Sequence, residues 1–491
     1  MIEQQQFRQV VPQTPVHLSA YVHAHDVSHG HVGLYHPFGH EVTFVSHETW
    51  KSLKAQNYDL VPGHIFSDLV ERRFLVPPGF DDTALQNVAV APIKGFINLW
   101  LLVVQTCNMG CSYCVVEAED QTKNLPVLPA LSNVPKGRMT PEVARAALRV
   151  FHQSLARNKQ PIAKVTIYGG EPLLNKSLLF DVIPEMRALD WPGRQHPLEI
   201  LCFTNGLTYD AEVTELFRKH NVTVGLSLDG KKEQNDRARV RLDGKGTHDQ
   251  VIKNYHRYRD AGVAVGISCT IGTHNVDDLP EIVQYFIEEL HAPSVQLQTP
   301  IQMPDANNPN YIDMKDAAAS SLAAFKKCRE AGIDEGLAMR RISRFVEGKF
   351  HHRDCFAVGG ELAVSPDGTM GPCHNATIGG SEYFRGNVLD RDFDPETARN
   401  FMEWHARMPV NMPGCHGCSF IGLCGGGCPY NALVMRGSIW EKDPQQCGYM
   451  ENFVDWLLDD IWERYNNARQ DVPRMQSRPT AATHQHAALG H

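Results

Sequence analysis

From residue 97 onward, short apolar or β-branched runs alternate with segments of helical periodicity. The runs fall at 99–104, 165–168, 198–203, 222–228, 263–271 and 294–298. The helical segments fall at about 141–157, 176–188, 209–220, 247–261 and 278–290. Strands that alternate with helices are typical of βα units and a parallel sheet. Six such units predict a partial (β/α)6 barrel of the TIM type, in which chemistry collects at the carboxyl ends of the strands.

The segments around this α/β barrel differ from it in composition. Before it, strands at 31–36 and 42–46, helices at 47–56 and 62–72 and an apolar run at 74–76 predict a small winged-helix-like module. After it, a polar loop at 300–310 and a helix at 313–331 predict a connector. A cysteine-rich segment follows, ending in an amphipathic helix at 448–468 with Phe453, Leu457, Ile461 and Tyr465 along one stripe.

We therefore expect five regions. They are an N-terminal module at 1–95, the barrel at 96–300, a helical connector at 301–353, a cysteine-rich iron–sulfur domain at 354–469 and a disordered tail at 470–491.

Charge and hydropathy exclude several classes of partner. The chain of 491 residues carries a net charge of -9 and has no Lys/Arg-rich arm, so we expect no nucleic-acid partner. It has no run of 18 apolar residues and no signal-peptide core, so we expect a cytoplasmic protein without a membrane partner. Because a reducing cytosol keeps thiols free, its 13 cysteines indicate metal or redox chemistry rather than disulfides.

The first cysteine cluster follows the first strand of the barrel directly. Cys107, Cys111 and Cys114 form a Cys-x3-Cys-x2-Cys loop. Three thiolates so close together can hold an iron–sulfur cubane and leave its fourth iron open to a small molecule. A zinc loop that borrows a distant fourth ligand is the alternative from spacing alone.

Polar motifs follow the next three strands. They are Gly169, Gly170, Glu171 and Pro172 after the second strand, Thr204 and Asn205 after the third, and Ser227 and Asp229 after the fourth. The glycines allow backbone to approach a ligand, and the Glu171 carboxylate can meet an ammonium group. Each motif alone is also compatible with a simple turn.

In this order, and with the aromatic Tyr113 before the third cysteine, these motifs resemble the radical S-adenosylmethionine (SAM) family. The resemblance spans about residues 97–300. It implies that the open iron binds the amino and carboxylate groups of SAM and that the motif at 169–172 meets the amino group. It further implies that Ser227 contacts the ribose and that Arg239 holds the carboxylate, with Arg237 and Arg241 as competitors.

A second set of cysteines lies downstream, at Cys355, Cys373, Cys415, Cys418, Cys424, Cys428 and Cys447. Seven thiols exceed one tetrahedral site and imply two metal centres, with zinc ribbons as the alternative to iron–sulfur clusters. A segment with so little apolar material is expected to fold around metal.

The spacing of these seven cysteines resembles the SPASM domain of peptide-modifying radical SAM enzymes. The resemblance implies one auxiliary [4Fe–4S] cluster on Cys415, Cys418, Cys424 and Cys447 and another on Cys355, Cys373 and Cys428, making three clusters in all. Some relatives carry an eighth cysteine at the position of Glu361.

His374 follows Cys373 at a position where anaerobic sulfatase maturases, which the architecture resembles, carry a catalytic Asp. A histidine there could act as a catalytic base, because its intrinsic pKa lies near neutral pH. A hydrogen-bonded structural role is the alternative. The other histidines are expected at the surface, and Cys202 and Cys269 in buried strands.

The resemblance implies a radical SAM peptide maturase whose partners are a precursor peptide and an electron donor such as flavodoxin or ferredoxin. A 5′-deoxyadenosyl radical would abstract hydrogen from the peptide, and we favour an intramolecular carbon–carbon or thioether cross-link as the product. Formylglycine formation, peptide epimerisation and a non-catalytic iron–sulfur electron carrier are the alternatives. The N-terminal module loosely resembles leader-peptide recognition domains, and a purely structural cap is the alternative.

Overall fold

The computed structural model of the chain describes residues 15–83, 90, 92–114, 137–158, 163–192, 197–299, 312–375 and 382–471. The expected loop at 300–310 lies outside the described residues, and so does the expected tail apart from residues 470–471, which end the last helix. None of the helices described has both the length and the apolar character that a membrane crossing needs.

The predicted barrel strands form one continuous parallel array. In order along the sheet they are β6 (Asn98–Val104), β7 (Lys164–Gly169), β8 (Glu199–Thr204), β9 (Val222–Ser227), β10 (Val265–Thr270) and β11 (Ser294–Gln298). Each pairs in parallel with the next. The partial α/β barrel expected from the sequence is confirmed.

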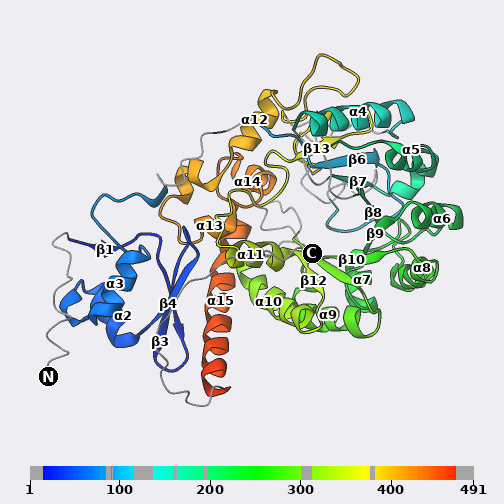
Figure 1. Cartoon of the computed structure of the whole chain (residues 1–491). Coiled ribbons are helices and arrows are strands. Elements are labelled where there is room, and N and C mark those ends of the chain that lie inside the picture. The colour runs from blue at the N-terminus through cyan, green and yellow to red at the C-terminus, as the bar shows by residue number, and fades with distance from the viewer. Residues whose placement is uncertain are drawn as a thin grey trace.

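Helices follow the strands and cover the outer side of the sheet (Figure 1). They are α4 (Pro141–Asn158), α5 (Lys176–Ala188), α6 (Ala211–Lys219), α8 (His248–Asp260) and α9 (Leu279–Glu288). Asp210 shows why α6 begins where it does, because its side chain accepts hydrogen bonds from the first turn, at Glu212 N and Val213 N. The short α7 (Lys232–Ala238) was not predicted, since it is polar and lacks an apolar stripe.

Alternation along the strands separates two environments. Val165, Ile167 and their equivalents on neighbouring strands point outward to the helices and are fully buried. Trp100, Tyr168 and Phe203 point the other way and keep part of their surface. Because successive side chains along a strand point to opposite faces, each strand contributes alternate residues to the apolar core and to the inner wall of the barrel.

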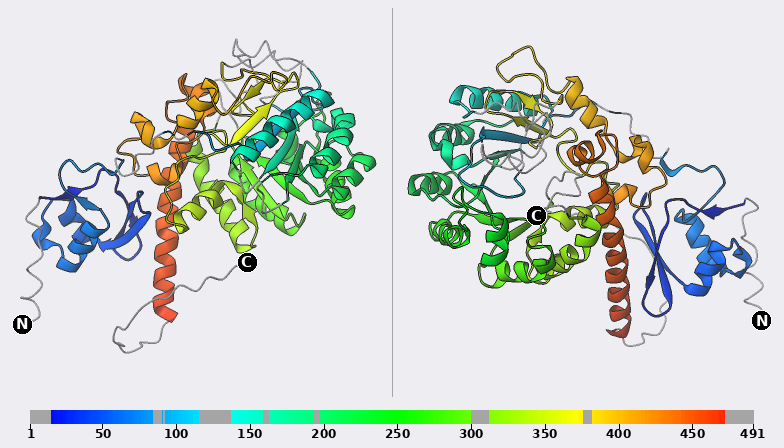
Figure 2. Two further views of the ribbon diagram at one scale, coloured as in Figure 1. Left: turned by 45° about the horizontal axis from the view of Figure 1, so that its top comes forward. Right: turned by 180° about the vertical axis from the view of Figure 1, so that it is seen from behind.

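The cysteine-rich segment extends the barrel sheet. Strand β13 (Glu361–Val364) pairs in parallel with β6, with Glu361 opposite Asn98, and β14 (Met370–Gly371) pairs antiparallel with β13. Figure 2 shows β13, in yellow, along the edge of the barrel sheet. At the other edge, β12 (Asp334–Glu335) pairs with β11. Neither extension was predicted, because such short strands carry no pattern of their own and their partners are distant in sequence.

The N-terminal module has the expected element order with two additions. Its sheet joins β2 (His23–Val27), β3 (His31–His36) and β4 (Glu41–Ser46), and it is followed by α2 (His47–Lys54) and α3 (Gly63–Glu71). The final strand β5 (Leu75–Val76) pairs with β1 (His17–Leu18). The module has its own apolar core, formed by residues such as Leu34, Leu53, Phe66 and Leu69.

The remaining helices join the barrel to the C-terminal region. They are α10 (Met314–Glu330), α11 (Gly336–Val346), α12 (Arg399–Ala406), α13 (Ile421–Cys424), α14 (Pro429–Arg436) and α15 (Pro444–Asp471). Short 3-10 turns occur at Tyr58–Leu60, Pro172–Asn175, Val276–Asp278, Pro409–Asn411 and Pro413–Cys415. The predicted apolar stripe of α15 is confirmed at Phe453 and Leu457, which are buried, whereas Tyr465 is 47% exposed.

The expectation that the other histidines lie at the surface is wrong for five of those described. His36, His40, His274, His351 and His405 are buried. At least one ring nitrogen of each lies near a polar group; His36 Nε2, for example, lies 3.3 Å from the buried Asp82 Oδ2. Cys202 and Cys269 are buried in strands, as expected.

Candidate active site

A cavity of about 370 Å³ opens at the carboxyl ends of the barrel strands and contains all three thiols of the first cysteine cluster. Cys107, Cys111 and Cys114 line it together. Of the other predicted site residues, it is lined by Tyr113, Gly169, Gly170, Thr204, Asn205, Ser227, Arg239 and His374. Glu171, Pro172 and Asp229 lie behind this lining.

The cysteine loop is held by backbone and side-chain bonds. Gly110 N donates to Val240 O at 2.8 Å and Ser112 N to Ala238 O at 3.0 Å. Asn205 Nδ2 donates to Cys107 Sγ at 3.5 Å. Burial raises the pKa of Cys107 and of Cys111, whereas the Arg239 guanidinium lowers the pKa of both. Three thiols facing one cavity beside a cation fit a cluster bound by thiolates.

The glycines at 169–170 are required by close packing. A Cβ atom on Gly170 would lie 2.2 Å from Thr106 O, and one on Gly169 would lie 2.1 Å from Val104 O. The ends of β6 and β7 can therefore meet only if both side chains are absent. Both glycines present backbone to the cavity, so the predicted contact with a ligand would come from backbone atoms.

Glu171 is fully buried and ties three segments together. Its carboxylate accepts hydrogen bonds from Leu173 N, Thr204 Oγ1 and Asn205 N at 2.8–3.0 Å. Burial raises the pKa of Glu171 and these three donors oppose the rise. Pro172 begins the 3-10 turn that follows. The hydrogen bonds of Glu171 show that it holds the segments at 171–173 and 204–205 together. Its direct contact with an ammonium group stays a prediction.

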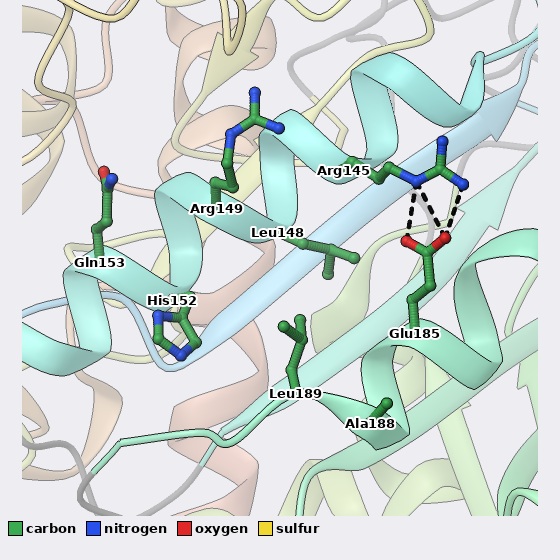
Figure 3. A pocket seen from close by; sticks show the side chains of 8 residues that line it. All are labelled: Arg145, Leu148, Arg149, His152, Gln153, Glu185, Ala188 and Leu189. Carbon is green, nitrogen blue, oxygen red and sulfur yellow. Dashed lines mark hydrogen bonds and ion pairs between the residues drawn. The ribbon is translucent and has the colours of Figure 1, made fainter.

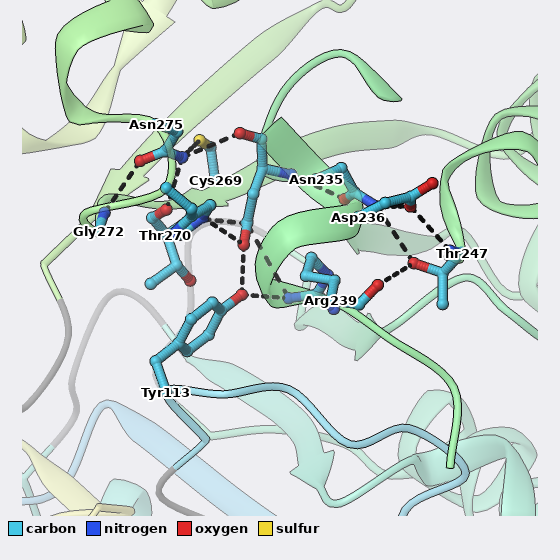
Figure 4. A network of polar contacts seen from close by, with 11 residues as sticks. Tyr113, Asn235, Asp236, Arg239, Thr247, Cys269, Thr270, Gly272 and Asn275 are labelled. Atoms are coloured by element: carbon cyan, nitrogen blue, oxygen red, sulfur yellow. Dashed lines mark hydrogen bonds and ion pairs between the residues drawn. The ribbon is translucent and has the colours of Figure 1, made fainter. Parts of the chain in front are cut away.

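Asp229 is the centre of a buried network on the other side of the cavity. Figure 4 shows Tyr113, Arg239 and Asn275, which belong to this network. It accepts a hydrogen bond from Tyr113 Oη at 2.5 Å, and Arg239 Nη1 donates to the same hydroxyl at 2.6 Å. His274 Nε2 lies 3.2 Å from Asp229 Oδ2. Although burial alone would raise the pKa of Asp229, Arg239 and His274 hold it below its usual value. Asp229 thus positions Tyr113 and Arg239.

The three candidate arginines differ in environment. Arg239 is buried and lines the cavity. Arg237 is exposed and pairs with Glu233 on the same helix. Arg241 forms a backbone bridge with Met109, and its side chain is absent from the cavity lining. This placement favours Arg239 for the predicted carboxylate contact.

One wall of the cavity is aromatic, and the sequence reasoning missed it. Trp100, Tyr168, Phe203 and His374 form a contiguous set in which the rings of Trp100 and His374 stack with centroids 3.6 Å apart and planes within 7°. The alternation of side chains along the strands could have predicted that Trp100, Tyr168 and Phe203 face the cavity. The position of His374 depends on the pairing of β13 with β6, which no local sequence pattern predicts.

The seven downstream cysteines fall into two groups. Cys415, Cys418, Cys424 and Cys447 line one cavity of about 160 Å³. The other three, Cys355, Cys373 and Cys428, lie in an apolar cluster with Trp404 and Tyr430. The resemblance to the SPASM domain implies the same two groups, and each set of thiols is of a kind that suits an iron–sulfur cluster.

A further hollow, of about 450 Å³, lies between α4 and α5 on the outer side of the barrel (Figure 3). Arg145 and Glu185 form an ion pair across it at 2.6 Å. Its lining includes none of the predicted site residues. The chemistry therefore belongs to the inner cavity.

Residues 101–286 match the model of the radical SAM superfamily. The chain therefore contains a radical SAM domain. The superfamily implies SAM and a [4Fe–4S] cluster as cofactors, and the residues that line the cavity fit both.

Three curated relatives match between 46% and 73% of the chain. The radical SAM cyclopropyl synthase TigE of Paramaledivibacter caminithermalis is 21% identical over 376 residues, which are 73% of each chain. The Fe-coproporphyrin III synthase of Methanosarcina barkeri is 22% identical over 71% of this chain and 88% of that one. A cysteine-type anaerobic sulfatase-maturating enzyme of Clostridium novyi is 22% identical over 46% of this chain and 63% of that one.

Solved structures share the fold. The enzyme anSMEcpe with bound AdoMet aligns with a TM-score of 0.61 at 17% identity, over 76% of this chain and all of that chain. Streptococcus suis SuiB bound to S-adenosylmethionine aligns with a TM-score of 0.54 at 16% identity, over 88% of this chain and 99% of that one. Both likenesses extend beyond residues 101–286 matched by the superfamily model.

Proposed function

We propose that this protein modifies a ribosomally made peptide by joining two of its side chains through a carbon–carbon or thioether bond. One observation carries the proposal. The cysteine-rich segment contributes His374 and Asn375 to the same cavity that holds Cys107, Cys111 and Cys114. The substrate would therefore react where the barrel and the downstream thiol groups meet.

Cys107, Cys111 and Cys114 would hold the cluster, and Arg239, Ser227 and the backbone at 169–170 would hold SAM beside it. The bound cofactors supply the 5′-deoxyadenosyl radical that removes a hydrogen atom from the substrate. The chain orients the target against its aromatic wall and excludes water from it.

A cross-link removes two hydrogens from the peptide. One would leave as a hydrogen atom that converts the 5′-deoxyadenosyl radical into 5′-deoxyadenosine, and the other would leave as a proton and an electron. We assign this proton to His374, which lines the cavity with its ring stacked on Trp100 and its Nδ1 2.9 Å from Glu361 Oε1. An auxiliary cluster on Cys355, Cys373 and Cys428 is the corresponding site for the electron, and one on Cys415, Cys418, Cys424 and Cys447 would relay it to or from a flavodoxin or ferredoxin.

Relatives support a peptide substrate. The structures of SuiB include a complex with its precursor peptide SuiA, and those of anSMEcpe include one with a Cp18Cys peptide. A maturation protein for sporulation killing factor, SkfB of Bacillus subtilis, is 25% identical over 190 residues. Formylglycine formation is the second candidate, favoured by the sulfatase-maturating relatives and opposed by His374.

We propose further that the N-terminal module binds a leader peptide as an added strand. The predicted hairpin consists of β3 and β4. Because β3 already pairs with β2 on its other side, β4 is the strand of this hairpin that can pair with an added strand. This assignment narrows the expected leader site to residues 41–46.

The reaction can be tested with a candidate precursor encoded beside this chain. Anaerobically reconstituted protein, dithionite, SAM and the peptide should yield 5′-deoxyadenosine and a product lighter by two hydrogen atoms. A Cys or Ser converted to an aldehyde would establish formylglycine formation instead, and uptake of one deuterium from D2O without cross-linking would establish epimerisation.

Replacing Cys107, Cys111 and Cys114 together by Ala should abolish 5′-deoxyadenosine formation and leave the iron of the auxiliary clusters bound. The physical reason is that no other three thiols face the SAM cavity among the residues described. Iron analysis and chromatography of the nucleoside check both parts. Full activity in this variant would contradict the assignment, and formation of no 5′-deoxyadenosine by the wild-type protein would leave only an electron carrier.

His374→Gln should lower cross-linked product by about 10²–10⁴-fold, the usual contribution of a general base. It should lower 5′-deoxyadenosine formation much less, because His374 would act after hydrogen abstraction. Product and nucleoside are measured in the same reaction. Equal loss of both would assign His374 to the structure of the cavity.

A further inference from the structure

Glu361 brings a carboxylate to a place where the structure also gathers thiols. It is the first residue of β13, and only 5% of its side chain is exposed. Ligand atoms of Glu361, Cys373 and His374 all lie within 4.8 Å of one another. A buried carboxylate normally needs a cation or several donors to compensate for lost hydration, and a metal centre would provide that compensation.

The other two thiols of this group lie in the same environment. Cys355 and Cys428 pack against the same buried cluster as Cys373, beside Trp404 and Tyr430. Three thiols and one carboxylate thus provide four donors, one for each iron of a [4Fe–4S] cluster.

We propose that Glu361 is the fourth protein ligand of the iron–sulfur cluster held by Cys355, Cys373 and Cys428. This inference rests on the auxiliary cluster proposed above and names the ligand that the cysteine pattern leaves open. We assign the iron bond to Oε2, because Oε1 already accepts hydrogen bonds from the backbone N and the Nδ1 of His374, each at 2.9 Å.

The competing donor in this group is His374. Coordination through its Nδ1 would break the bond to Glu361 and remove a donor from a buried carboxylate, which is costly. With Glu361 as the ligand, the hydrogen bond from His374 persists, and one carboxylate connects the cluster to the residue that faces the substrate cavity.

The iron of this cluster can be tested selectively in the complete holoprotein. Ferricyanide oxidises a [4Fe–4S]2+ cluster by one electron to the 3+ level, and loss of Fe2+ then leaves [3Fe–4S]+, which is paramagnetic. Excess SAM protects the open iron of the first cluster, and four cysteines protect the cluster on Cys415, Cys418, Cys424 and Cys447. Wild-type protein, Glu361→Gln, Glu361→Cys and His374→Ala would be compared by electron paramagnetic resonance, iron content and Mössbauer spectroscopy, with circular dichroism to verify folding.

We expect Glu361→Gln to give a three-iron signal several-fold stronger than wild type and to lose up to one iron per chain. Glu361→Cys should restore resistance, and His374→Ala should stay close to wild type. A cluster equally resistant in wild type and Glu361→Gln would overturn the ligand assignment alone, as would selective iron loss in His374→Ala. Wild-type iron sufficient for only two clusters, with none assignable to Cys355, Cys373 and Cys428, would overturn both this assignment and the proposed auxiliary cluster.

Discussion

At the scale of single residues, the site depends on charges that are buried and mutually compensated. Asp229 has no exposed surface, yet Arg239 and His274 keep its pKa below the usual 3.8 despite the opposing effect of burial. Its stabilising contribution is therefore complete above the unfolded value and is lost as the pH falls through the lower folded value. At neutral pH the carboxylate is ionised and holds Tyr113 and Arg239 in place.

Asp229→Asn should lower the free energy of unfolding by about 3–5 kcal/mol, because it leaves the buried charge of Arg239 without its partner. It should also weaken SAM binding. Thermal unfolding under anaerobic conditions and SAM titration measure the two effects. Asp249→Asn is the matched control, since that carboxylate pairs with Lys232 at the surface with 73% of its side chain exposed. Similar shifts in both variants would contradict the role of the buried network.

At the scale of elements, the active cavity depends on how closely neighbouring strands approach. The carbonyl oxygens of Val104 and Thr106 occupy the space that side chains at 169 and 170 would need. Thr106 directly precedes Cys107, so the position of the first thiol is coupled to the end of β7. The sequence suggested that Gly169 and Gly170 serve ligand binding. The structure shows that close packing of the backbone also requires glycine at both positions.

Gly170→Ala should displace the loop that carries Cys107, because the new Cβ would lie 2.2 Å from a backbone oxygen that cannot move alone. We expect reconstitution to lose the iron of one cluster and 5′-deoxyadenosine formation to fall at least tenfold. Gly137→Ala controls for the substitution, since its nearest atom would be Pro366 Cβ at 3.7 Å; it should change stability by less than about 0.5 kcal/mol. Normal iron content in Gly170→Ala would refute this coupling.

At the scale of the whole molecule, α15 connects the N-terminal module to the catalytic part. The helix packs against α10 on one side and contacts β2 and β3 on the other (Figure 1). Its Trp462 is buried and donates from Nε1 to Ser28 O at 3.1 Å, while its ring meets His31 and Phe44. Asp455 adds a contact of 2.6 Å to His23 Nε2. This contact joins the proposed leader-binding module to the part of the chain that holds the catalytic cavity.

Trp462→Ala should weaken docking of the module by about 3–5 kcal/mol, the range for truncation of a buried aromatic side chain. Hydrogen exchange in β2 and β3 should rise, and modification of a leader-bearing peptide should fall, while 5′-deoxyadenosine formation without peptide changes less than twofold. Tyr465→Ala is the control, because that ring is 47% exposed on the same helix. Unchanged hydrogen exchange in β2 and β3 of Trp462→Ala would show that other contacts hold the N-terminal module against α15.

Local pattern determined much of this protein. Alternating strands and helices predicted the barrel, and the spacing at 107–114 together with residues at successive strand ends predicted one cavity, because parallel strands bring their carboxyl ends to one edge. Tertiary structure decided the rest. The pairing of β13 with β6 placed Glu361 and His374 beside Trp100, and the burial of His274 behind Tyr113 completed the Asp229 network. Such contacts join residues hundreds of positions apart or within loops without periodicity, and they form only when the sheet has closed around them.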